Sequence, residues 1–249
     1  MAGLGAPAQI DKSFLLLFFK KEDFPCKLRA MAVTRVHQSW LAAREKRLLI
    51  AIASRLPRWV TPDRLTLLGL FGAWLTGLAF VATRRSPDFL WIACIGLCLN
   101  WFGDSLDGTL ARARRIERPI YGYFVDHSTD VISQVFIFLG LGASPYLRFD
   151  AACLILMSYW MAALLTFIRA VATNVFQISY YGIGPTEIRI ALLLYAVVVF
   201  FAGRLTLPWL PITLIDLFGF VLFPLVFLSF VLMVWAESKV LAAEDDQRG

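Results

Sequence analysis

The chain has 249 residues, 59% of them hydrophobic, and its mean hydropathy is +0.69. Soluble domains contain about 45–50% apolar residues, even when a slightly larger set of residue types is counted as apolar. This composition therefore favours an integral membrane protein. The formal net charge is +6, but no recognised nucleic-acid-binding motif accompanies it. We therefore attribute the basic residues to membrane orientation and anionic lipid headgroups, and we expect membrane lipids but no nucleic acid as partners.

The N-terminal region, residues 1–56, is predicted to contain a tail and a helix at the membrane surface. Basic residues alternate with apolar ones from Arg35 to Leu56, which is typical of an amphipathic helix lying in the interface with its apolar face inward. Pro57 is expected to bend the chain into the first span. Residues before Met31 fit no predicted element, and the sequence does not decide whether they belong to the native protein.

Six apolar stretches follow, which predicts an all-α, polytopic membrane bundle of six transmembrane helices over residues 57–237. A helix needs about 20 residues to cross the hydrocarbon core of a bilayer. The fifth stretch is short, and we expect it to include the turn that begins at Pro185. A polar C-terminal tail, residues 238–249, completes the chain. The six stretches are Leu65–Ala82, Phe89–Leu106, Tyr123–Ala143, Ala151–Thr173, Ile188–Ala202 and Ile212–Ala236.

Basic residues indicate how the spans are oriented. Six spans place both termini, the second loop and the fourth loop on one side, which then carries all but four of the 24 Lys and Arg residues. The positive-inside rule makes this side cytoplasmic. We therefore expect an integral protein of the bacterial inner membrane, with both termini and the second loop, next to Asp104–Asp130, on the cytoplasmic side. The exceptions are Arg84, Arg85, Arg148 and Arg204.

Four aspartates lie where the second span ends and the third begins. Asp104 and Asp107 are three residues apart, and Asp126 and Asp130 are four apart, so each pair shares a helix face. The short connection makes the two helices antiparallel neighbours, and we expect the four carboxylates to meet in one pocket. Two such charges 4 Å apart repel by about 4 kcal/mol at an effective dielectric of 20, so the pocket requires cations. Mg²⁺ or Mn²⁺ suits these oxygen ligands, and two ions fit the number of carboxylates.

Small residues and one arginine accompany the aspartates. Gly108, Ala111 and Gly122 remove side-chain bulk where helices or a nucleotide approach closely. Arg112 supplies a permanent, forked cation that suits phosphate oxygens. Beside a metal site, these residues predict a pocket for a metal-bridged diphosphate.

The motif resembles a known family signature. The pattern D-x-x-D-G-x-x-A-R begins at Asp104, and G-x-x-x-D-x-x-x-D follows and ends at Asp130. All eight specified positions match the signature of the CDP-alcohol phosphatidyltransferase family. Val60–Thr66 is also similar to the family's lead-in to its first helix, although asparagine is common where this chain has Asp63. The resemblance implies an integral membrane enzyme with six core helices. Such an enzyme transfers a substituted phosphate from a CDP-linked donor to a hydroxyl acceptor and releases CMP.

The resemblance also implies roles for the signature residues. Asp104, Asp107 and Asp126 would hold metal against the donor diphosphate. Asp130 would be the base that takes the proton of the acceptor hydroxyl while also contacting an ion. A homodimer is implied as well. The remaining positions would shape and contact the CDP part: Gly108, Ala111, Arg112 and Gly122.

Two segments resemble one branch of the family. The sequence DHxxD from Asp126 and the sequence GPTE from Gly184 are similar to elements of choline and ethanolamine phosphotransferases, which use CDP-choline or CDP-ethanolamine with diacylglycerol. Those enzymes are longer and contain extra helices. CDP-diacylglycerol with a polar alcohol acceptor is therefore an equal expectation, and the identity of the acceptor stays open.

Other polar residues near the motif have two interpretations. A lone histidine such as His127 is more often a local hydrogen-bond partner than a catalyst. The sequence GPTE is typical of a helix start, with proline in the first turn and a glutamate favoured by the helix dipole. Alternatively, Thr186, Glu187 or Arg189 contacts the acceptor or its headgroup.

Two other classes of membrane protein bind cations through carboxylates. A transporter places such a site near the bilayer midplane beside broken helices, whereas these aspartates lie towards a helix end. An intramembrane prenyltransferase carries its aspartates on well-separated segments, whereas all four lie within 27 residues of this chain. Both classes are therefore less favoured, and release of CMP from a CDP-linked donor distinguishes the enzyme from them.

Overall fold

A computed structural model describes residues 34–36, 42–173, 175–177 and 184–246 of the chain. Helices dominate this part, as the sequence predicts, and two three-residue strands accompany them. The predicted tail before residue 34 lies outside the described residues. In chain order the helices are α3 (Ala42–Arg55), α4 (Pro62–Ala82), α5 (Phe89–Arg114), α6 (Pro119–Gly142), α7 (Phe149–Thr173), α8 (Pro185–Ala202) and α9 (Leu214–Asp246).

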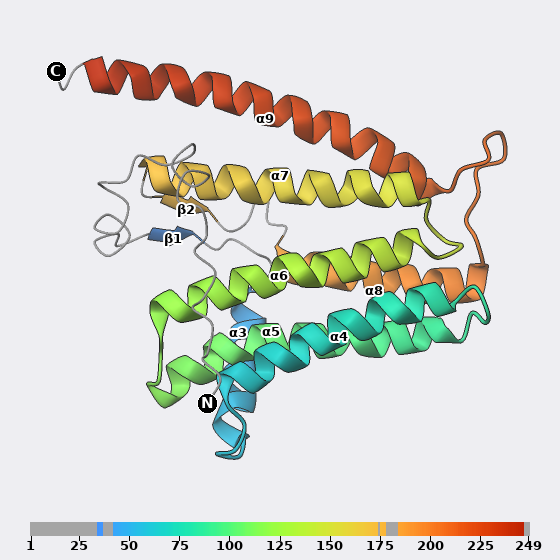
Figure 1. Cartoon of the computed structure of the whole chain (residues 1–249), viewed down its shortest axis with the longest axis horizontal. Coiled ribbons are helices and arrows are strands. Elements are labelled where there is room, and N and C mark those ends of the chain that lie inside the picture. The colour runs from blue at the N-terminus through green and yellow to red at the C-terminus, as the bar shows by residue number, and fades with distance from the viewer. Residues whose placement is uncertain (1–33, 37–41, 174, 178–183, 247–249) are drawn as a thin grey trace, which may run out of the picture.

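The long helices α4 to α9 share a rough direction, and their connections gather at two ends of the bundle (Figure 1). The α4–α5, α6–α7 and α8–α9 connections lie at one end. The α5–α6 connection and the C-terminal end of α9 lie at the other. The four arginines that the sequence separates from the rest all fall in the first group of connections: Arg84, Arg85, Arg148 and Arg204.

Five described helices are long and apolar enough to cross a membrane: Pro62–Ala82, Phe89–Arg114, Phe149–Arg169, Pro185–Ala202 and Leu214–Ala243. The predicted fifth span does begin at Pro185, as its short apolar stretch requires. Helix α6 corresponds to the predicted third span but is not among the five. Its first half carries Asp126, His127 and Asp130, which lower the mean hydropathy of the helix.

Helix α4 holds the two aspartate-bearing helices in place. It packs extensively against α5 and also against α6, whereas α5 and α6 contact each other over a short stretch only. A Cβ on Gly103 of α5 would overlap backbone atoms of Leu65 and Gly69. A Cβ on Gly140 of α6 would likewise overlap the backbone of Gly77. The prediction that the two aspartate-bearing helices are direct neighbours is therefore correct only locally, because α4 provides most of their packing.

Two apolar clusters stabilise the described chain. The larger one lies among α4 to α8 and includes Phe80, Leu97 and Leu141, all nearly inaccessible to solvent. The smaller one lies among α3, α4 and α5 and includes Leu49, Leu65 and Leu106. Many large apolar side chains on the outer surface stay exposed, as expected of helices that face lipid.

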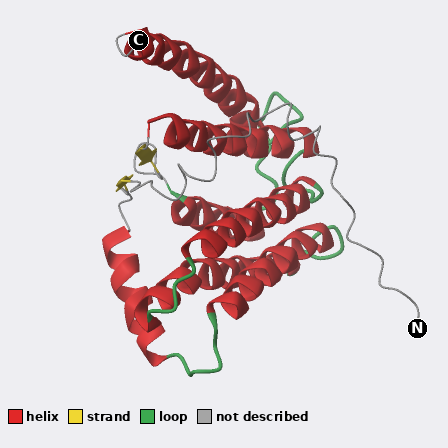
Figure 2. Cartoon of the chain, turned by 60° about the vertical axis from the view of Figure 1, so that its left-hand side comes forward, coloured by secondary structure: helices red, strands yellow, loops and turns green. Residues whose placement is uncertain are grey.

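Helix α3 runs steeply across the ends of the other helices and appears at the left in Figure 2. It corresponds to the predicted surface helix but begins at Ala42 and not at Arg35. The residues Thr34–Val36 instead form strand β1, which pairs in parallel with β2 (Val175–Gln177) after α7. Two β-branched residues in a three-residue segment favour a strand over a helix start. Residues 37–41 of the predicted helix lie outside the described residues.

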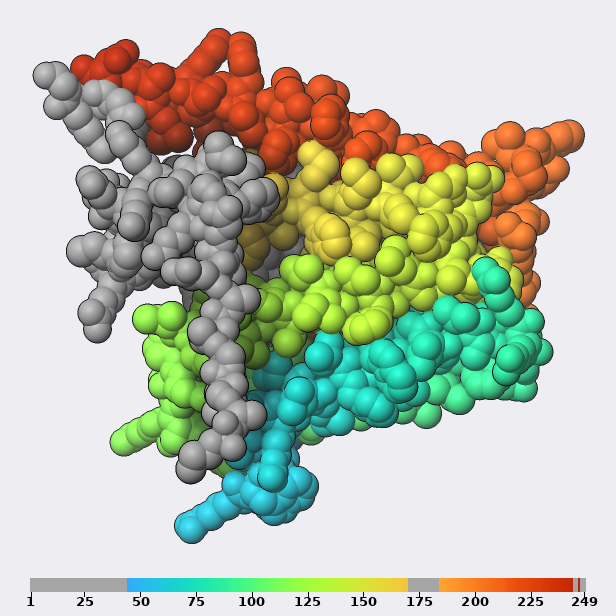
Figure 3. Space-filling view, viewed as in Figure 1, coloured from blue at the N-terminus to red at the C-terminus, as the bar shows by residue number. Residues whose placement is uncertain are grey.

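Helix α9 forms one edge of the molecule beside α7 (Figure 3). It runs from Leu214 to Asp246 and therefore includes the first residues of the tail predicted over 238–249. Glu237 near this end pairs with Arg169 of α7 at 2.7 Å. This ion pair lies just before the predicted tail, and most of the helical residues that follow it are exposed.

Candidate active site

Three carboxylates converge at the end of the bundle where α5 turns into α6. Asp104 comes from α5, and Asp126 and Asp130 come from successive turns of α6. Each contributes one oxygen, and these three oxygens all lie within 4.8 Å of one another. Hard oxygen donors at this separation suit Mg²⁺ or Mn²⁺, so the residues present fit the predicted divalent cation.

The connection between α5 and α6 produces this convergence. Helix α5 ends at Arg114, and Arg115 adopts the left-handed conformation with φ of 56°. Pro119 then starts α6, where its fixed φ suits the first turn. Arg118, just before this proline, forms an ion pair with Asp63 at the start of α4. The chain therefore reverses within four residues and returns Asp126 towards α5.

Asp107 is oriented differently from the other three aspartates. Its Oδ2 accepts a hydrogen bond from Oγ1 of Thr66 on α4 at 2.6 Å, and its Oδ1 accepts one from the backbone N–H of Gly108. It is not part of the three-residue cluster, although it lies within electrostatic range of Asp104 and Asp126. The structure thus brings together three of the four predicted metal ligands and directs the fourth towards α4.

Arg189 of α8 joins the cluster from the opposite side. Its Nη2 lies 2.7 Å from Oδ2 of Asp104 and 3.6 Å from Oδ1 of Asp130. Its Nε donates to Oδ1 of Asn100 at 2.9 Å, and the amide of Asn100 donates to the backbone oxygen of Gly69 at 3.0 Å. A cation among apolar residues of a membrane helix needs such partners. The sequence raised Arg189 as an alternative contact, but nothing in it marked Asn100.

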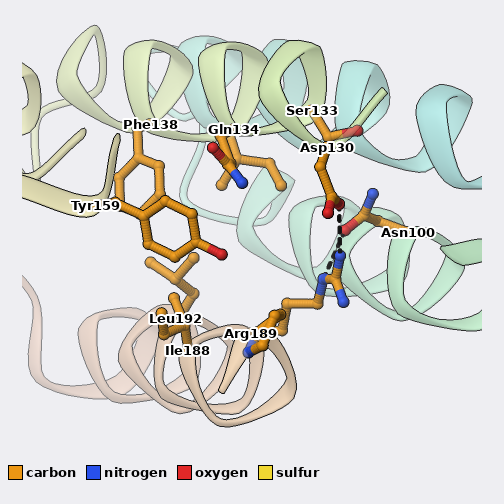
Figure 4. Close-up of a pocket in the computed structure, with 11 residues that line it drawn as sticks. Asn100, Asp130, Ser133, Gln134, Phe138, Tyr159, Ile188, Arg189 and Leu192 are labelled. Carbon is orange, nitrogen blue, oxygen red and sulfur yellow. Dashed lines mark hydrogen bonds and ion pairs between the residues drawn. The ribbon is translucent and has the colours of Figure 1, made fainter. Parts of the chain in front are cut away.

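A pocket extends from Asp130 into the bundle between α5, α6, α7 and α8 (Figure 4). The phenol oxygen of Tyr159 points into it, and Gln134 lies on the neighbouring helix. The side-chain oxygen of Gln134 accepts a hydrogen bond from the indole N–H of Trp160 at 2.7 Å. The remaining wall is largely apolar and includes Ile137, Phe138, Ile188 and Leu192. The sequence does not identify Tyr159 and Gln134 as site residues, because each is an isolated polar residue on an apolar helix and belongs to no motif.

The other signature residues lie near the surface at the same end of the bundle. Arg112 is exposed, and its Nη2 donates to Oγ1 of Thr109 at 3.3 Å. A Cβ on Gly108 would lie nearest the guanidinium of Arg112, 3.3 Å away, and a Cβ on Gly122 would meet nothing within 4 Å. Ala111 is half-buried between them in the sequence. Helix packing therefore does not explain the glycine at 122, where the surface is open.

His127 and Glu187 make local contacts. Nδ1 of His127 lies 3.3 Å from Oδ2 of Asp126, and its ring packs against Tyr123 and Phe167. Oε2 of Glu187 accepts a hydrogen bond from the backbone N–H of Gly184 at 2.9 Å, which closes the first turn of α8. The hydrogen bond of Glu187 is the one that a helix start at GPTE predicts.

The chain is similar in sequence to one protein family and to several known enzymes. The sequence model of a family described as CDP-alcohol phosphatidyltransferase matches residues 59–237. The chain is 29% identical over 164 residues to cholinephosphotransferase 1 of Gallus gallus, covering 61% of this chain and 47% of that protein. It is 29% identical to the Bos taurus protein of the same name, covering 64% of this chain and 41% of that protein. It is 30% identical over 105 residues to archaetidylinositol phosphate synthase of Pyrococcus horikoshii, covering 42% and 52% of the two chains. The chain thus spans less than half the length of these two cholinephosphotransferases.

Proposed function

Because the chain belongs to the CDP-alcohol phosphatidyltransferase family, we propose that it transfers a substituted phosphate from a CDP-linked donor to a hydroxyl acceptor and releases CMP. This reaction would make the protein an enzyme of phospholipid biosynthesis. The observation that carries the proposal is the convergence of Asp104, Asp126 and Asp130 within 4.8 Å at one end of the helix bundle.

The three clustered carboxylates would hold Mg²⁺ or Mn²⁺. When bound, the cation neutralises the donor diphosphate and the departing CMP. Arg189 contributes one positive charge against three carboxylates, so the cluster retains a negative charge that favours a divalent ion. A second ion, with Asp107 as a further ligand, is part of the proposal because Asp107 lies one turn from Asp104.

Asp130 is proposed to act as the catalytic base. The acceptor hydroxyl gives its proton to the Asp130 carboxylate as its oxygen forms a bond to phosphorus. The bond from that phosphorus to the oxygen of CMP breaks, and CMP leaves. Asp130 lines the pocket between α5 and α8, so an acceptor in that pocket would present its hydroxyl to this carboxylate.

The CDP part of the donor is proposed to bind at the surface end of the motif. Arg112 would contact phosphate oxygens, since its guanidinium is exposed and forked. The open surface at Gly122 would let the nucleotide approach the backbone closely. Gly108 and Ala111 have small side chains and would leave space for the nucleotide along this face of α5.

The names of the relatives support two alternative pairings of donor and acceptor. Two matched proteins are cholinephosphotransferases, which supports CDP-choline or CDP-ethanolamine as donor and diacylglycerol as acceptor. The archaetidylinositol phosphate synthase supports the alternative, in which the lipid is on the CDP-linked donor and the acceptor is a polar alcohol. Part of the pocket wall, formed by Ile137, Phe138 and Leu192, is apolar and would face an apolar part of the acceptor.

The proposed enzyme crosses the membrane six times, and α6 is its third span, in addition to the five helices that are apolar enough by themselves. Helix α6 is 24 residues long and lies beside α4 and α7, and a protein interior tolerates its aspartates better than lipid does. Helix α3 would lie on the cytoplasmic surface, and the site would face the cytoplasm of a bacterial cell. A homodimer completes the proposal.

Purified protein in detergent tests the reaction. It is supplied with Mg²⁺ and either CDP-choline or CDP-ethanolamine with diacylglycerol, or CDP-diacylglycerol with a panel of polar alcohols. We expect release of CMP with one pairing, loss of release on chelation with EDTA, and recovery with Mg²⁺ or Mn²⁺; mass spectrometry of the lipid product identifies the acceptor. Cation flux in proteoliposomes without CMP release from any pairing would instead support a transporter.

A further inference from the structure

Glu45 of α3 contacts α5 and α8, two of the three helices that contribute charged side chains to the candidate site. Its Oε1 accepts hydrogen bonds from the indole N–H of Trp101 at 2.9 Å and from Oγ of Ser105 at 3.3 Å, both on α5. The same oxygen accepts a hydrogen bond from Oγ1 of Thr186 on α8 at 3.0 Å. One carboxylate oxygen therefore connects three helices at the end of the bundle that holds the aspartate cluster.

The donors of these bonds lie beside the residues of the site. Ser105 follows Asp104 directly, and Thr186 precedes Arg189 by three residues, about one helical turn. Asp104 and Arg189 are ion-paired at 2.7 Å. Glu45 thus holds both helices whose side chains form this pair, although it contacts neither partner of the pair in the bonds described.

Helix α3 is a firm support for this carboxylate. Leu49, one turn after Glu45, is buried against α5. The guanidinium of Arg114 at the end of α5 donates to the backbone oxygens of Leu56, Pro57 and Val60, which fixes the connection from α3 to α4. Charge-assisted hydrogen bonds are stronger and shorter than neutral ones, so a carboxylate held on a docked helix is well suited to fix its donors.

We propose that Glu45 is a positioning residue that sets the separation of α5 and α8 and thereby places Arg189 against Asp104 and Asp130. This inference rests on the proposed function, since the placement matters for transfer of the phosphate group. A displacement of about 1 Å in reacting groups costs on the order of 100-fold in rate. Glu45 therefore acts on turnover through Arg189, and not through contact with either substrate.

A double-mutant cycle tests the link between Glu45 and Arg189. Glu45→Ala is expected to lower kcat at least about 10-fold while the KM for the CDP-linked donor changes less than about threefold. If Glu45 acts through Arg189, the double variant Glu45→Ala with Arg189→Lys loses little more activity than Arg189→Lys alone. The proposal would be overturned if the activity losses of the two single variants multiply in the double variant. It would also be overturned if Glu45→Ala raises KM and leaves kcat unchanged. Glu45→Gln keeps an acceptor oxygen without the charge and should lie between Glu45→Ala and the wild type.

A second measurement is independent of the reaction. Hydrogen–deuterium exchange of the first turns of α8, residues 185–192, should become faster in Glu45→Ala because the bond to Thr186 is lost. Lys46→Gln changes an exposed neighbour on the same helix and is the matched control for both measurements. Unchanged exchange in a folded Glu45→Ala protein would overturn the positioning role whether or not CMP is released. Wild-type protein that releases no CMP, with the exchange difference present, would refute the proposed function and leave the connection through Glu45 standing.

Discussion

At the scale of single residues, the balance of charge explains the candidate site. Asp104 and Asp130 pair with one guanidinium, that of Arg189, and Asp126 adds a third carboxylate to the cluster, so the negative charge is not balanced without a further cation. Helical spacing alone predicts that Asp126 and Asp130 share a face, since four residues turn the helix by about 400°. It does not predict the orientation of Asp107, because the competing donor Thr66 comes from another helix.

Replacement of Asp130 by asparagine tests its proposed role as the base. The amide is similar in size but cannot accept the proton of the acceptor, so we expect turnover to fall by about 10²–10⁴-fold. Binding of the CDP-linked donor, measured by isothermal titration calorimetry, should stay largely intact. Asp246→Asn makes the same substitution at the exposed end of α9, away from the site, and is the matched control. Turnover of Asp130→Asn equal to that of the wild type would remove Asp130 from the catalytic role.

At the scale of helices, close packing of α4 explains how the site is assembled. The sequence predicts the long helices because they coincide with apolar stretches, and α4 also has a clear start at Pro62 after the capping residue Thr61. It does not predict which helices touch, since small residues on α4, α5 and α6 allow several arrangements. The insertion of α4 beside both aspartate-bearing helices depends on packing at Gly103 and Gly140, which only the three-dimensional structure shows.

Two glycine substitutions separate packing from substrate contact. Gly103→Ala places a methyl group against the backbone of α4, which cannot move aside as a side chain can, so we expect a loss of about 1–3 kcal/mol of stability. Gly122→Ala meets open space and should leave stability unchanged or raise it by up to about 1 kcal/mol through helix propensity. Thermal unfolding in detergent measures both.

The activity of the same two variants adds a second comparison. Gly122→Ala should raise the KM for the CDP-linked donor, because the proposed nucleotide surface gains a methyl group. A fall in the melting temperature of Gly122→Ala as large as that of Gly103→Ala would contradict the distinction between them.

At the scale of the whole molecule, the distribution of basic residues agrees with the connectivity. The connections at one end of the bundle contain Arg84, Arg85, Arg148 and Arg204, and the motif lies at the other end. Apolar length predicted five of the spans well. The predicted third span, α6, is not among these five, and its first half carries Asp126 and Asp130 of the aspartate motif.

Labelling of single cysteines tests the orientation. In a cysteine-free background, a cysteine introduced at Arg85 should react with a membrane-impermeant maleimide in intact bacterial cells. A cysteine introduced at Lys239 should react only after the membrane is permeabilised, because the positive-inside rule places that end in the cytoplasm. The reverse pattern would show that the site faces the opposite side of the membrane.

The central claim is that α5 and α6 together form a divalent-cation site, and location of Mn²⁺ in a crystal tests it most directly. Crystals grown with Mn²⁺ and a CDP-linked donor are measured near the manganese absorption edge. We predict an anomalous peak in contact with carboxylate oxygens of Asp104, Asp126 and Asp130, next to the donor diphosphate. Well-ordered donor and aspartates with no anomalous peak between them would contradict the account.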